Sequence, residues 1–297
     1  MEKKNWNIIF QNLIVCLIAV GLAFAVSYGG TTVFGSFPIY GLMVIIAFGI
    51  QWIVFIPSFI FKTEKYYDLT GSFTYTTVII LSTILVGAFD FRSIIILVLV
   101  LLWTLRLGLF LFKRIVKAGE DKRFTEMKKS GLEFFRAWNI QGLWVSFTTA
   151  AALATLTTPK LDYGIWDWIT MILGVLLWIL GFYFEALADH QKKKFREDSA
   201  NQGKFIHGGL WSISRHPNYF GEITLWFGVA IIALPTLQGW RWFALISPLF
   251  VLLLLTKISG VPLLENYADK KWGGQPEYEE YKKNTPILFP ISFKKKK

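Results

Sequence analysis

The residues with the clearest chemical potential lie in one short stretch, GGLWSISRHPNYFGEITLWFG, ahead of a long apolar segment. Pro217 suits the first turn of a helix, where its missing N–H costs nothing. The N–H groups of Asn218 and Tyr219 would then be free at a helix N-terminus, which attracts anions. Arg215 and His216 add positive charge, so this helix start is a candidate anion site.

Two further features of the stretch support a built site. Gly208 and Gly209 allow a tight turn before the helix. Glu222 lies four residues past Asn218, on the same face of the expected helix. The alternative is a capped, basic anchor at the membrane interface, which needs fewer special residues than this stretch contains.

A second polar face precedes the first, in FEALADHQKKKFR. Glu185, Asp189, Lys192 and Arg196 are spaced so that a continuous helix would put all four on one face. A carboxylate there could accept hydrogen bonds from ribose or amide donors, and an arginine can hold a phosphate bidentately. The alternative is an exposed amphipathic helix end laced with salt bridges.

Weaker candidates lie elsewhere in the chain. Arg106, within LLWTLRLGLFLFKRI, either snorkels to the interface or meets a partner inside the bundle. Glu64, Tyr66, Tyr67 and Asp68 are either loop residues or the acid end of a substrate cavity. The amphipathic tail GVPLLENYADKKWGGQPEYEEYKKNTPILFP places a further acid, at position 265, near the membrane.

The elements that must position these residues are membrane-spanning helices. The 297 residues are 54% hydrophobic and only 17% charged, against about 25% charge in soluble domains. The 13 Trp and 11 Tyr suit interfacial belts. We predict an all-α polytopic transmembrane helix bundle of seven or eight spans, whose cytoplasmic loops and tail cap a cofactor cavity. The expected spans are 8–29, 38–61, 71–89, 93–112, 139–158, 165–187, 222–235 and 240–257.

The positive charge predicts sidedness. The net charge of +11 is carried between the apolar spans, which favours positive-inside topology over nucleic-acid binding. With eight spans, all of the 31 Lys and Arg lie on the side of the N-terminus except Arg92, Arg106, Lys160 and Arg241. We therefore expect both termini to be cytoplasmic, and a bacterial plasma membrane is the simplest location.

Several classes of site are not expected. Cys16 is the single cysteine, which excludes an intrachain disulfide and a cysteine-based metal cluster. The three His residues have no convincing metal spacing, and the chain has no Walker loop, no Rossmann fingerprint and no nucleophile elbow. The N-terminal apolar run is too long for a signal peptide and reads as the first transmembrane helix.

Three ordered motifs, GLWSISRHPNYFGE, EALADHQKKKFR and PLLEN…YEEYKKNTPILFP, together resemble the DUF1295 group of multi-pass membrane proteins. That group is related to the steroid 5-alpha-reductases and more distantly to sterol reductases. The resemblance runs from about Tyr67 to Pro290. It suggests N-terminal transmembrane helices over 1–62 and a reductase-like membrane domain over 63–297. Isoprenylcysteine and phospholipid methyltransferases share the RHP-Tyr-Gly helix start and the YxxYxxxTP ending.

The reductase relatives imply NADPH lying among the helices on the cytoplasmic side. The resemblance carries cofactor contacts to Arg106, Asp189, Arg196, Asn218 and Glu222. It also marks two departures, because position 185 has Glu for an Asn and position 204 has Lys for an Arg. The complete expected cofactor-binding set is Arg106, Glu185, Asp189, Arg196, Lys204, Arg215, His216, Asn218, Tyr219, Glu222 and Glu265.

The substrate half of the site departs further from the relatives. Asp68 falls where the steroid enzymes have a catalytic Glu, and Trp103 falls where they have a catalytic Tyr. Trp103 offers one N–H but no transferable proton at neutral pH. Asp68 could serve as the acid if burial keeps it protonated, or Tyr66 or Tyr67 could substitute. The expected catalytic set is Asp68, Tyr67 and Trp103.

The sequence leaves three functions open. The first is a membrane NADPH-dependent oxidoreductase that reduces a C=C bond of a lipid-like substrate, such as a steroid, enone or isoprenoid, entering from the bilayer. The second is an S-adenosylmethionine-dependent lipid or prenylcysteine methyltransferase. The third is a non-catalytic lipid-binding protein of the same fold, for which Trp103 is the best argument. The Asp189 and Arg196 pair favours the reductase, and membrane lipids are the expected partners in each case.

Overall fold

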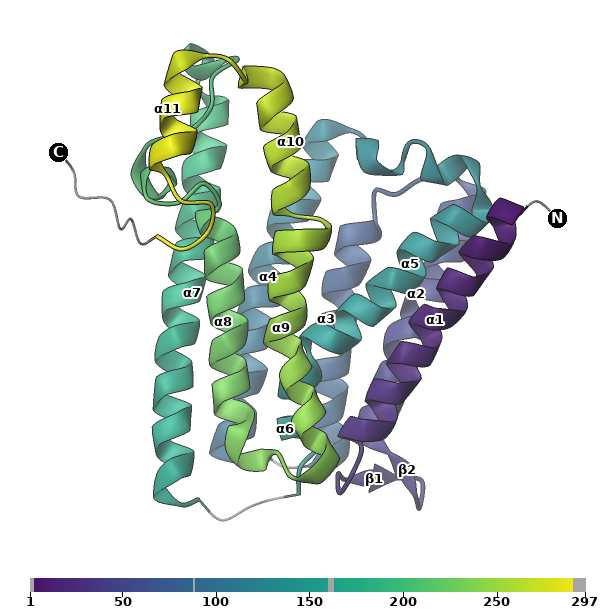
Figure 1. Cartoon of the computed structure of the whole chain (residues 1–297). Helices are drawn as coiled ribbons and strands as arrows, with labels where there is room; N and C mark the ends of the chain where they lie inside the picture. Colours follow the sequence, from purple (N-terminus) through teal and green to yellow (C-terminus); the bar gives the residue numbers. More distant parts are fainter. Residues whose placement is uncertain (1–2, 88, 160–162, 291–297) are drawn as a thin grey trace. The chain divides into compact units, whose positions relative to one another are not determined.

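The chain is built almost entirely of helices (Figure 1). The computed structural model describes residues 3–87, 89–159 and 163–290. The α-helices are α1 Lys3–Val26, α2 Ile39–Ile60, α3 Tyr67–Val86, α4 Phe91–Ala118, α5 Gly131–Thr148, α6 Ala150–Leu156, α7 Ile165–Glu197, α8 Pro217–Ala233, α9 Ile246–Leu253, α10 Val261–Trp272 and α11 Pro276–Asn284. The predicted all-α fold is confirmed.

Short elements join these helices. Strands β1 Thr32–Val33 and β2 Phe37–Pro38 form a small antiparallel hairpin between α1 and α2. Single turns of 3₁₀-helix are η1 Lys122–Phe124, η2 Met127–Lys129, η3 Ser199–Asn201, η4 Gly209–Ser212 and η5 Leu234–Thr236, with a longer η6 Gly239–Leu245. The segment η7 Leu254–Ile258 is a π-helix that links α9 to α10.

Seven helical stretches of the described residues are long and apolar enough to cross a membrane. They are Asn5–Val26, Ile39–Ile60, Tyr67–Val86, Phe91–Ala118, Ile165–Glu197, Pro217–Thr236 and Gly239–Trp272. The chain is therefore an integral, multi-pass membrane protein. The last two stretches are longer than the expected spans 222–235 and 240–257, because each helical stretch continues into polar residues.

The segment 139–158, expected to be one span, is divided instead. Helix α5 ends at Thr148 and α6 begins at Ala150. At this division the carbonyl oxygen of Thr148 accepts a hydrogen bond from the Ser247 hydroxyl at 2.5 Å. The Thr149 hydroxyl also bonds back to the carbonyl oxygen of Val145, a contact that bends helices. Just after α6, the carbonyl oxygen of Thr157 accepts a hydrogen bond from the N–H of Thr31, beside the β-hairpin. The end of α6 therefore lies beside the hairpin that joins α1 to α2.

The chain forms two compact units. The first comprises Met1–Met171 and Ile232–Ser247, and the second comprises Ile172–Ile231 and Pro248–Lys297. Each unit is described below by itself. The division near residue 62 that follows from the family resemblance stays a prediction.

In the second unit, α7 and α8 approach to backbone contact. A Cβ atom on Gly221 would lie 2.5 Å from the carbonyl oxygen of Gly181 and would also meet the Glu185 nitrogen. Two turns farther along, a Cβ atom on Gly228 would lie 2.6 Å from the carbonyl oxygen of Gly174. Small residues at such contacts let membrane helices pack closely. The contact brings the end of α7 beside the start of α8, where the predicted site residues lie.

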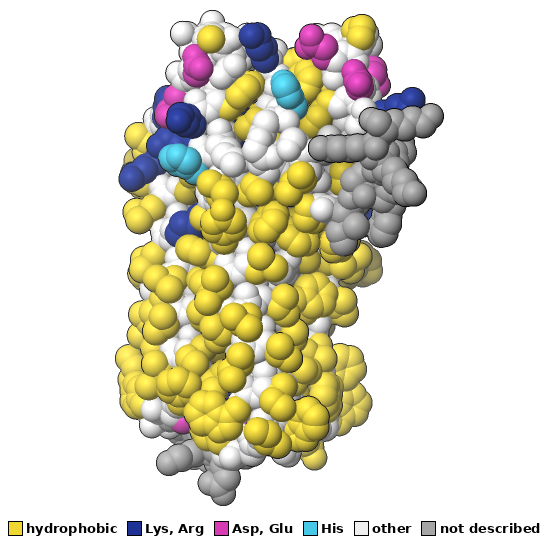
Figure 2. All heavy atoms as spheres, turned by 90° about the vertical axis from the view of Figure 1, so that its left-hand side faces the viewer, with side chains coloured by type: hydrophobic (Ala, Val, Ile, Leu, Met, Phe, Trp, Pro, Cys, Tyr) yellow, Lys and Arg dark blue, Asp and Glu magenta, His cyan; other side chains and the backbone are white. Residues whose placement is uncertain are grey.

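The outer face of α7 is apolar along its membrane-spanning part. Figure 2 shows hydrophobic side chains covering most of the face that it presents, with charged side chains gathered toward one end. Exposed apolar residues on α7 in the second unit are Ile172, Leu173, Leu176, Ile179, Leu180 and Tyr183. Exposed apolar surface of this extent is suited to acyl chains.

We predict that Gly221→Ala destabilises the protein by about 1–3 kcal/mol, because the added methyl group overpacks the α7–α8 contact. The measurement is the thermal unfolding midpoint in mild detergent. Gly49→Ala is the matched control, since Gly49 lies inside α2 and has nothing within 4 Å of an added Cβ. The control should lose no stability, and an equal loss in both variants would refute the packing argument.

Candidate functional site

The start of α8 is fixed in the second unit by contacts from two directions. The indole N–H of Trp211 donates to the carbonyl oxygen of Ala188 on α7 at 3.1 Å, and the N–H of Leu210 donates to the Gln191 side chain at 2.9 Å. From the tail, the carbonyl oxygen of Pro286 accepts from the Arg215 N–H at 2.9 Å. The tail therefore bonds directly to the RHP stretch, and the expected capping of a cofactor cavity stays a prediction.

The two polar faces seen in the sequence meet at Asp189 and Asn218. Helix α7 is continuous through Glu197, so the expected single helix carrying Glu185 to Arg196 is confirmed. The Asn218 side-chain nitrogen donates to Asp189 Oδ1 at 3.2 Å, and Asp189 is buried. Asn218 lies one residue inside α8, which begins at Pro217 as predicted.

A carboxylate of the chain itself occupies the cationic end of this cluster. Glu265, on α10, pairs with Arg215 at 2.6 Å and accepts from His216 Nε2 at 2.7 Å. The expectation of a free N–H at Tyr219 is wrong, because that group donates to the carbonyl oxygen of His216 at 3.1 Å. The helix start therefore holds an internal anion, and one of the two donors expected for an external anion is used.

His216 offers a buried acceptor. A carboxylate can only accept, so His216 Nε2 carries the proton and Nδ1 carries the lone pair. Burial lowers the pKa of His216 and outweighs the hydrogen bond to Glu265, which acts to raise it, so the ring is neutral near pH 7. The ring stacks on Tyr219 at 5.6 Å between centroids, and Gly260 leaves room for the Tyr219 ring.

Apart from Arg215 Nη1, which is ion-paired with Glu265, three buried polar atoms of Arg215, His216 and Asn218 have no hydrogen-bond partner among the residues that the structure describes. They are His216 Nδ1, Asn218 Oδ1 and Arg215 Nε. Buried polar atoms without partners carry an energetic cost and call for a ligand or water. Two acceptors and one donor are suited to the hydroxyl and amide groups of a nucleotide ligand, so this set fits a cofactor such as a dinucleotide.

The other residues of the expected cofactor set lie around this cluster or outside it. Glu185 is buried on α7, one turn before Asp189, and Glu222 is half-buried on α8, one turn after Asn218. Arg196 and Lys204 are exposed beyond them. The Lys192 ammonium lies 4.5 Å from the Trp211 ring centroid. Buried acids are thus flanked by exposed cations within the second unit.

The expected catalytic residues and Arg106 belong to the first unit. Tyr67 packs its ring on Phe124 and Trp138, at 4.7 and 5.2 Å between centroids, and its hydroxyl donates to the carbonyl oxygen of Ala137 at 3.0 Å. Its phenol is therefore held by the backbone of α5. The structure gives Tyr67 a packing role, and its expected catalytic role stays a prediction.

Asp68 faces cations of the first unit. Its Oδ2 lies 3.4 Å from Arg114 Nη2. Asp121 holds Arg123 through both carboxylate oxygens, because Nε donates to Oδ1 at 3.0 Å and Nη2 donates to Oδ2 at 2.5 Å. Burial acts to raise the pKa of Asp121, but the bonds from Arg123 outweigh it and lower that pKa.

Trp103 is buried beside a tyrosine that sequence reasoning missed. Its ring meets Tyr75 edge to face at 5.1 Å, and Tyr75 lies seven residues after Asp68 on α3. Residues at i and i+7 share a helix face, and that spacing could have found Tyr75. Arg106, one turn after Trp103 on α4, places its guanidinium 5.8 Å from the Phe110 ring.

Glu64 ties the loop after α4 to the turn between α2 and α3. It is 3% exposed, accepts from the Asp121 N–H at 2.8 Å and pairs with Lys128. Burial acts to raise the pKa of Glu64, but Lys128 and the backbone donor outweigh it, so the pKa lies below its ordinary value. Glu64, weighed in the sequence as loop or cavity acid, is a buried structural tie.

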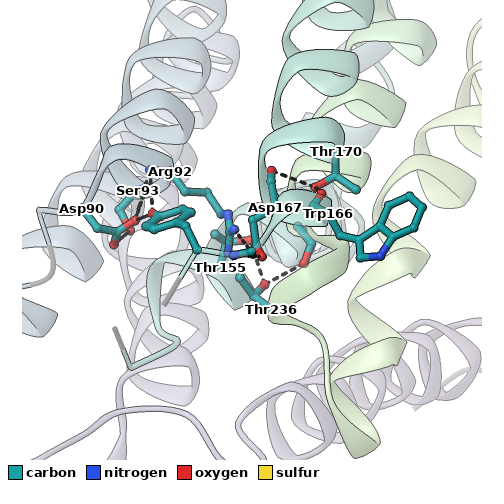
Figure 3. A network of polar contacts seen from close by, with 11 residues as sticks. Asp90, Arg92, Ser93, Thr155, Trp166, Asp167, Thr170 and Thr236 are labelled. Carbon is teal, nitrogen blue, oxygen red and sulfur yellow. Dashed lines mark hydrogen bonds and ion pairs between the residues drawn. The ribbon is translucent and has the colours of Figure 1, made fainter. Parts of the chain in front are cut away.

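A second polar network, which the sequence did not reveal, lies at the opposite end of the first unit (Figure 3). Asp90 caps α4, accepting from the Arg92 and Ser93 N–H groups, and also accepts from the Tyr163 hydroxyl. Arg92 pairs with Asp167 at the start of α7. The sequence predicted Arg92 as a charged residue in a loop between two spans. Instead it is buried, and its ion pair with Asp167 joins the start of α4 to the start of α7.

Comparison with known sequences places the chain in a family. Residues 51–285 match the model of a family described as "Protein of unknown function (DUF1295)". The chain belongs to this family. The DUF1295 match contains every expected site residue and excludes α1. The family resemblance predicted from the three motifs is thereby confirmed.

Named relatives of this DUF1295 protein include steroid-converting enzymes. It is 29% identical over 129 residues to the 3-oxo-5-alpha-steroid 4-dehydrogenase 1 of Rattus norvegicus, covering 42% of this chain and 44% of that protein. It is 29% identical over 107 residues to the steroid 5-alpha-reductase DET2 of Arabidopsis thaliana, covering 35% and 34%. An uncharacterised protein of Schizosaccharomyces pombe is 26% identical over 159 residues, covering 46% and 43%.

The matched region spans less than half the length of these relatives. No solved structure matches the chain significantly. Within residues 3–87, 89–159 and 163–290, no group of three or more His, Cys, Asp or Glu side chains could hold a metal ion.

We predict that Glu64→Gln destabilises the protein by on the order of 3 kcal/mol near neutral pH, because it breaks a buried pair. The pKa of Glu64 is lowered in the fold, so its contribution is present above about pH 4.5 and is lost as the pH falls through the lowered value. The difference between the thermal unfolding midpoints of the unaltered protein and the variant should therefore become smaller as the pH falls below about 4.5.

The control is Glu126→Gln. Glu126 pairs with Lys129 in the same loop, but both side chains are exposed, at 77% and 68%. Exposed pairs contribute little, so this variant should match the unaltered protein at every pH. A pH-independent gap for Glu64→Gln would contradict the ionic role of Glu64.

Proposed function

We propose that this protein is an integral membrane reductase that saturates a C=C bond of a steroid-like or other lipid-like enone, with NADPH as the reductant. The bound nucleotide would supply a hydride to the β-carbon. The observation that carries the proposal is the buried acceptor pair, His216 Nδ1 and Asn218 Oδ1, beside Asp189. It is supported by the similarity of this chain to a protein named steroid 5-alpha-reductase.

The second unit supplies residues of the kinds that a nucleotide needs. Asn218 and His216 would accept from ribose or carboxamide donors, with Asp189 orienting the Asn218 amide. Arg196 and Lys204 are exposed beyond the buried acids. They would hold the phosphate groups, because arginine and lysine donate charge-assisted hydrogen bonds to phosphate oxygens. The lipid-like substrate would enter from the bilayer, because the helices expose apolar side chains there.

The internal pairing of Glu265 favours a nucleotide reductase over a methyltransferase. An S-adenosylmethionine enzyme would use the helix start for the methionine carboxylate. Here Arg215 and His216 already hold the Glu265 carboxylate, and a second carboxylate would be repelled. Two buried acceptors likewise suit donors better than an anion.

Tyr75 is the phenol that the proposed chemistry requires. Saturating an enone needs a proton donor or hydrogen-bond donor at the substrate oxygen, and Trp103 has no transferable proton. Tyr75 lies against Trp103 and shares a face of α3 with Asp68. We propose Tyr75 as the donor in place of Tyr67 and Trp103, with Asp68 two turns away on the same face of α3.

The nucleotide proposal predicts that NADPH raises the thermal unfolding midpoint of the purified protein in mild detergent. Asn218→Ala should require about tenfold more NADPH for the same rise in the midpoint, because it loses one or two hydrogen bonds to the nucleotide. Asn201→Ala is the matched control, because Asn201 also donates to an aspartate, Asp198, but in an exposed turn. The control should respond as the unaltered protein does.

The same assay separates the other functions. A shift with S-adenosylmethionine and none with NADPH or NADH would identify the methyltransferase and overturn the proposal. A response to neither nucleotide nor S-adenosylmethionine would favour a lipid-binding protein without catalysis.

The proton-donor proposal predicts that Tyr75→Phe lowers turnover at least about 100-fold while leaving the NADPH-induced shift unchanged. Turnover is measured as NADPH oxidation in the presence of a steroid or isoprenoid enone. Tyr183→Phe, which removes a phenol from the exposed face of α7, is the control and should retain full turnover. Loss of turnover in Tyr67→Phe but not in Tyr75→Phe would instead restore Tyr67 as the donor.

A further inference from the structure

The first unit contains a groove whose lining includes Tyr67 but neither Tyr75 nor Asp68, the two residues proposed above for the reduction. It lies between α1 and α5, near the loop before α5, and has a volume of about 490 Å³, within the usual range for ligand sites. Its lining includes Gln11, Ile14, Arg123, Arg136, Ile140 and Trp144. Helix α1, which supplies one side of the groove, lies outside the residues 51–285 that match the family model.

The groove is polar at one end and apolar along the rest. Arg136 and Gln11 meet at 2.5 Å at the polar end, with Arg123 nearby in the lining. Ile140 and Trp144 continue the same face of α5, and Trp144 lies two turns beyond Arg136, about 12 Å along the helix. This is the shape of a site for an amphiphile with a charged head and an apolar chain.

The charge at the polar end selects an anion. Arg123 is already neutralised by Asp121. Arg136 bonds only to the neutral Gln11, and among the described side chains no carboxylate lies within ion-pair distance of it. A phosphate head group would complete Arg136 by a charge-assisted hydrogen bond.

Apolar side chains of the groove are exposed at the protein surface. Ile14 on α1 and Ile140 on α5 are 36% and 39% exposed. Both residues belong to helices of the membrane-embedded unit, and Arg136 lies within two turns of the start of α5, close to the basic loop that carries Lys128 and Lys129. An acyl chain can therefore lie along the groove while its head group stays at the interface.

We propose that this groove is a structural binding site for an anionic phospholipid, with Arg136 holding the phosphate and the α1–α5 surface holding one acyl chain. The ligand joins α1 to the family core. It is neither the substrate nor the cofactor of the proposed reduction, so this site stands independently of that function.

The test compares phosphatidylglycerol with phosphatidylcholine, each added to the full-length protein in mild detergent, by thermal unfolding. Phosphatidylglycerol should raise the midpoint more than phosphatidylcholine. Arg136→Gln should require at least about tenfold more phosphatidylglycerol for the same shift. Lys65→Gln is the matched control, because it removes one exposed cation outside the groove and should leave the response intact.

A second pair of variants tests the acyl-chain contact without changing charge. Ile140→Trp fills the groove and should reduce the response to phosphatidylglycerol, whereas Ile45→Trp, on an exposed face of α2, should not. Equal stabilisation of the unaltered protein by both lipids, no stabilisation by phosphatidylglycerol, or a full response in Arg136→Gln would each overturn the proposal.

Discussion

The candidate nucleotide cluster depends on one constraint, the backbone contact between α7 and α8. Gly181 and Gly221 leave no room for a side chain between the helices, so the last polar turns of α7 lie directly against the first turn of α8. Asp189 can therefore reach Asn218, and Trp211 can bond to the carbonyl oxygen of Ala188. A wider helix pair would separate these groups, and no change of side chain alone could restore them.

The chemistry of the cluster then follows from an anion that the chain supplies. Glu265 neutralises Arg215 and fixes the proton of His216 on Nε2. The sequence of the RHP stretch predicts a positively charged site for an anion. With Glu265 paired to Arg215 and His216, the site instead presents the buried hydrogen-bond acceptors His216 Nδ1 and Asn218 Oδ1.

Composition and span periodicity were enough to predict the all-α membrane fold, and motif order was enough to predict the family. The helix start at Pro217 and the continuity of α7 also followed from local pattern. Three features did not, because each depends on residues distant in sequence. The pairing of Glu265 with Arg215, the division between α5 and α6, and the contact of Tyr75 with Trp103 are tertiary.

The division between α5 and α6 has a consequence for the order in which the membrane protein is assembled. The carbonyl oxygen of Thr148 accepts from the Ser247 hydroxyl, and these residues are separated by 99 positions in the chain. An unpaired carbonyl is costly in the bilayer interior. During synthesis, the α5–α6 segment emerges well before Ser247 does. The hydrogen bond between Thr148 and Ser247 therefore forms only after the C-terminal helices are made, even though the neighbouring α1 to α4 are made first.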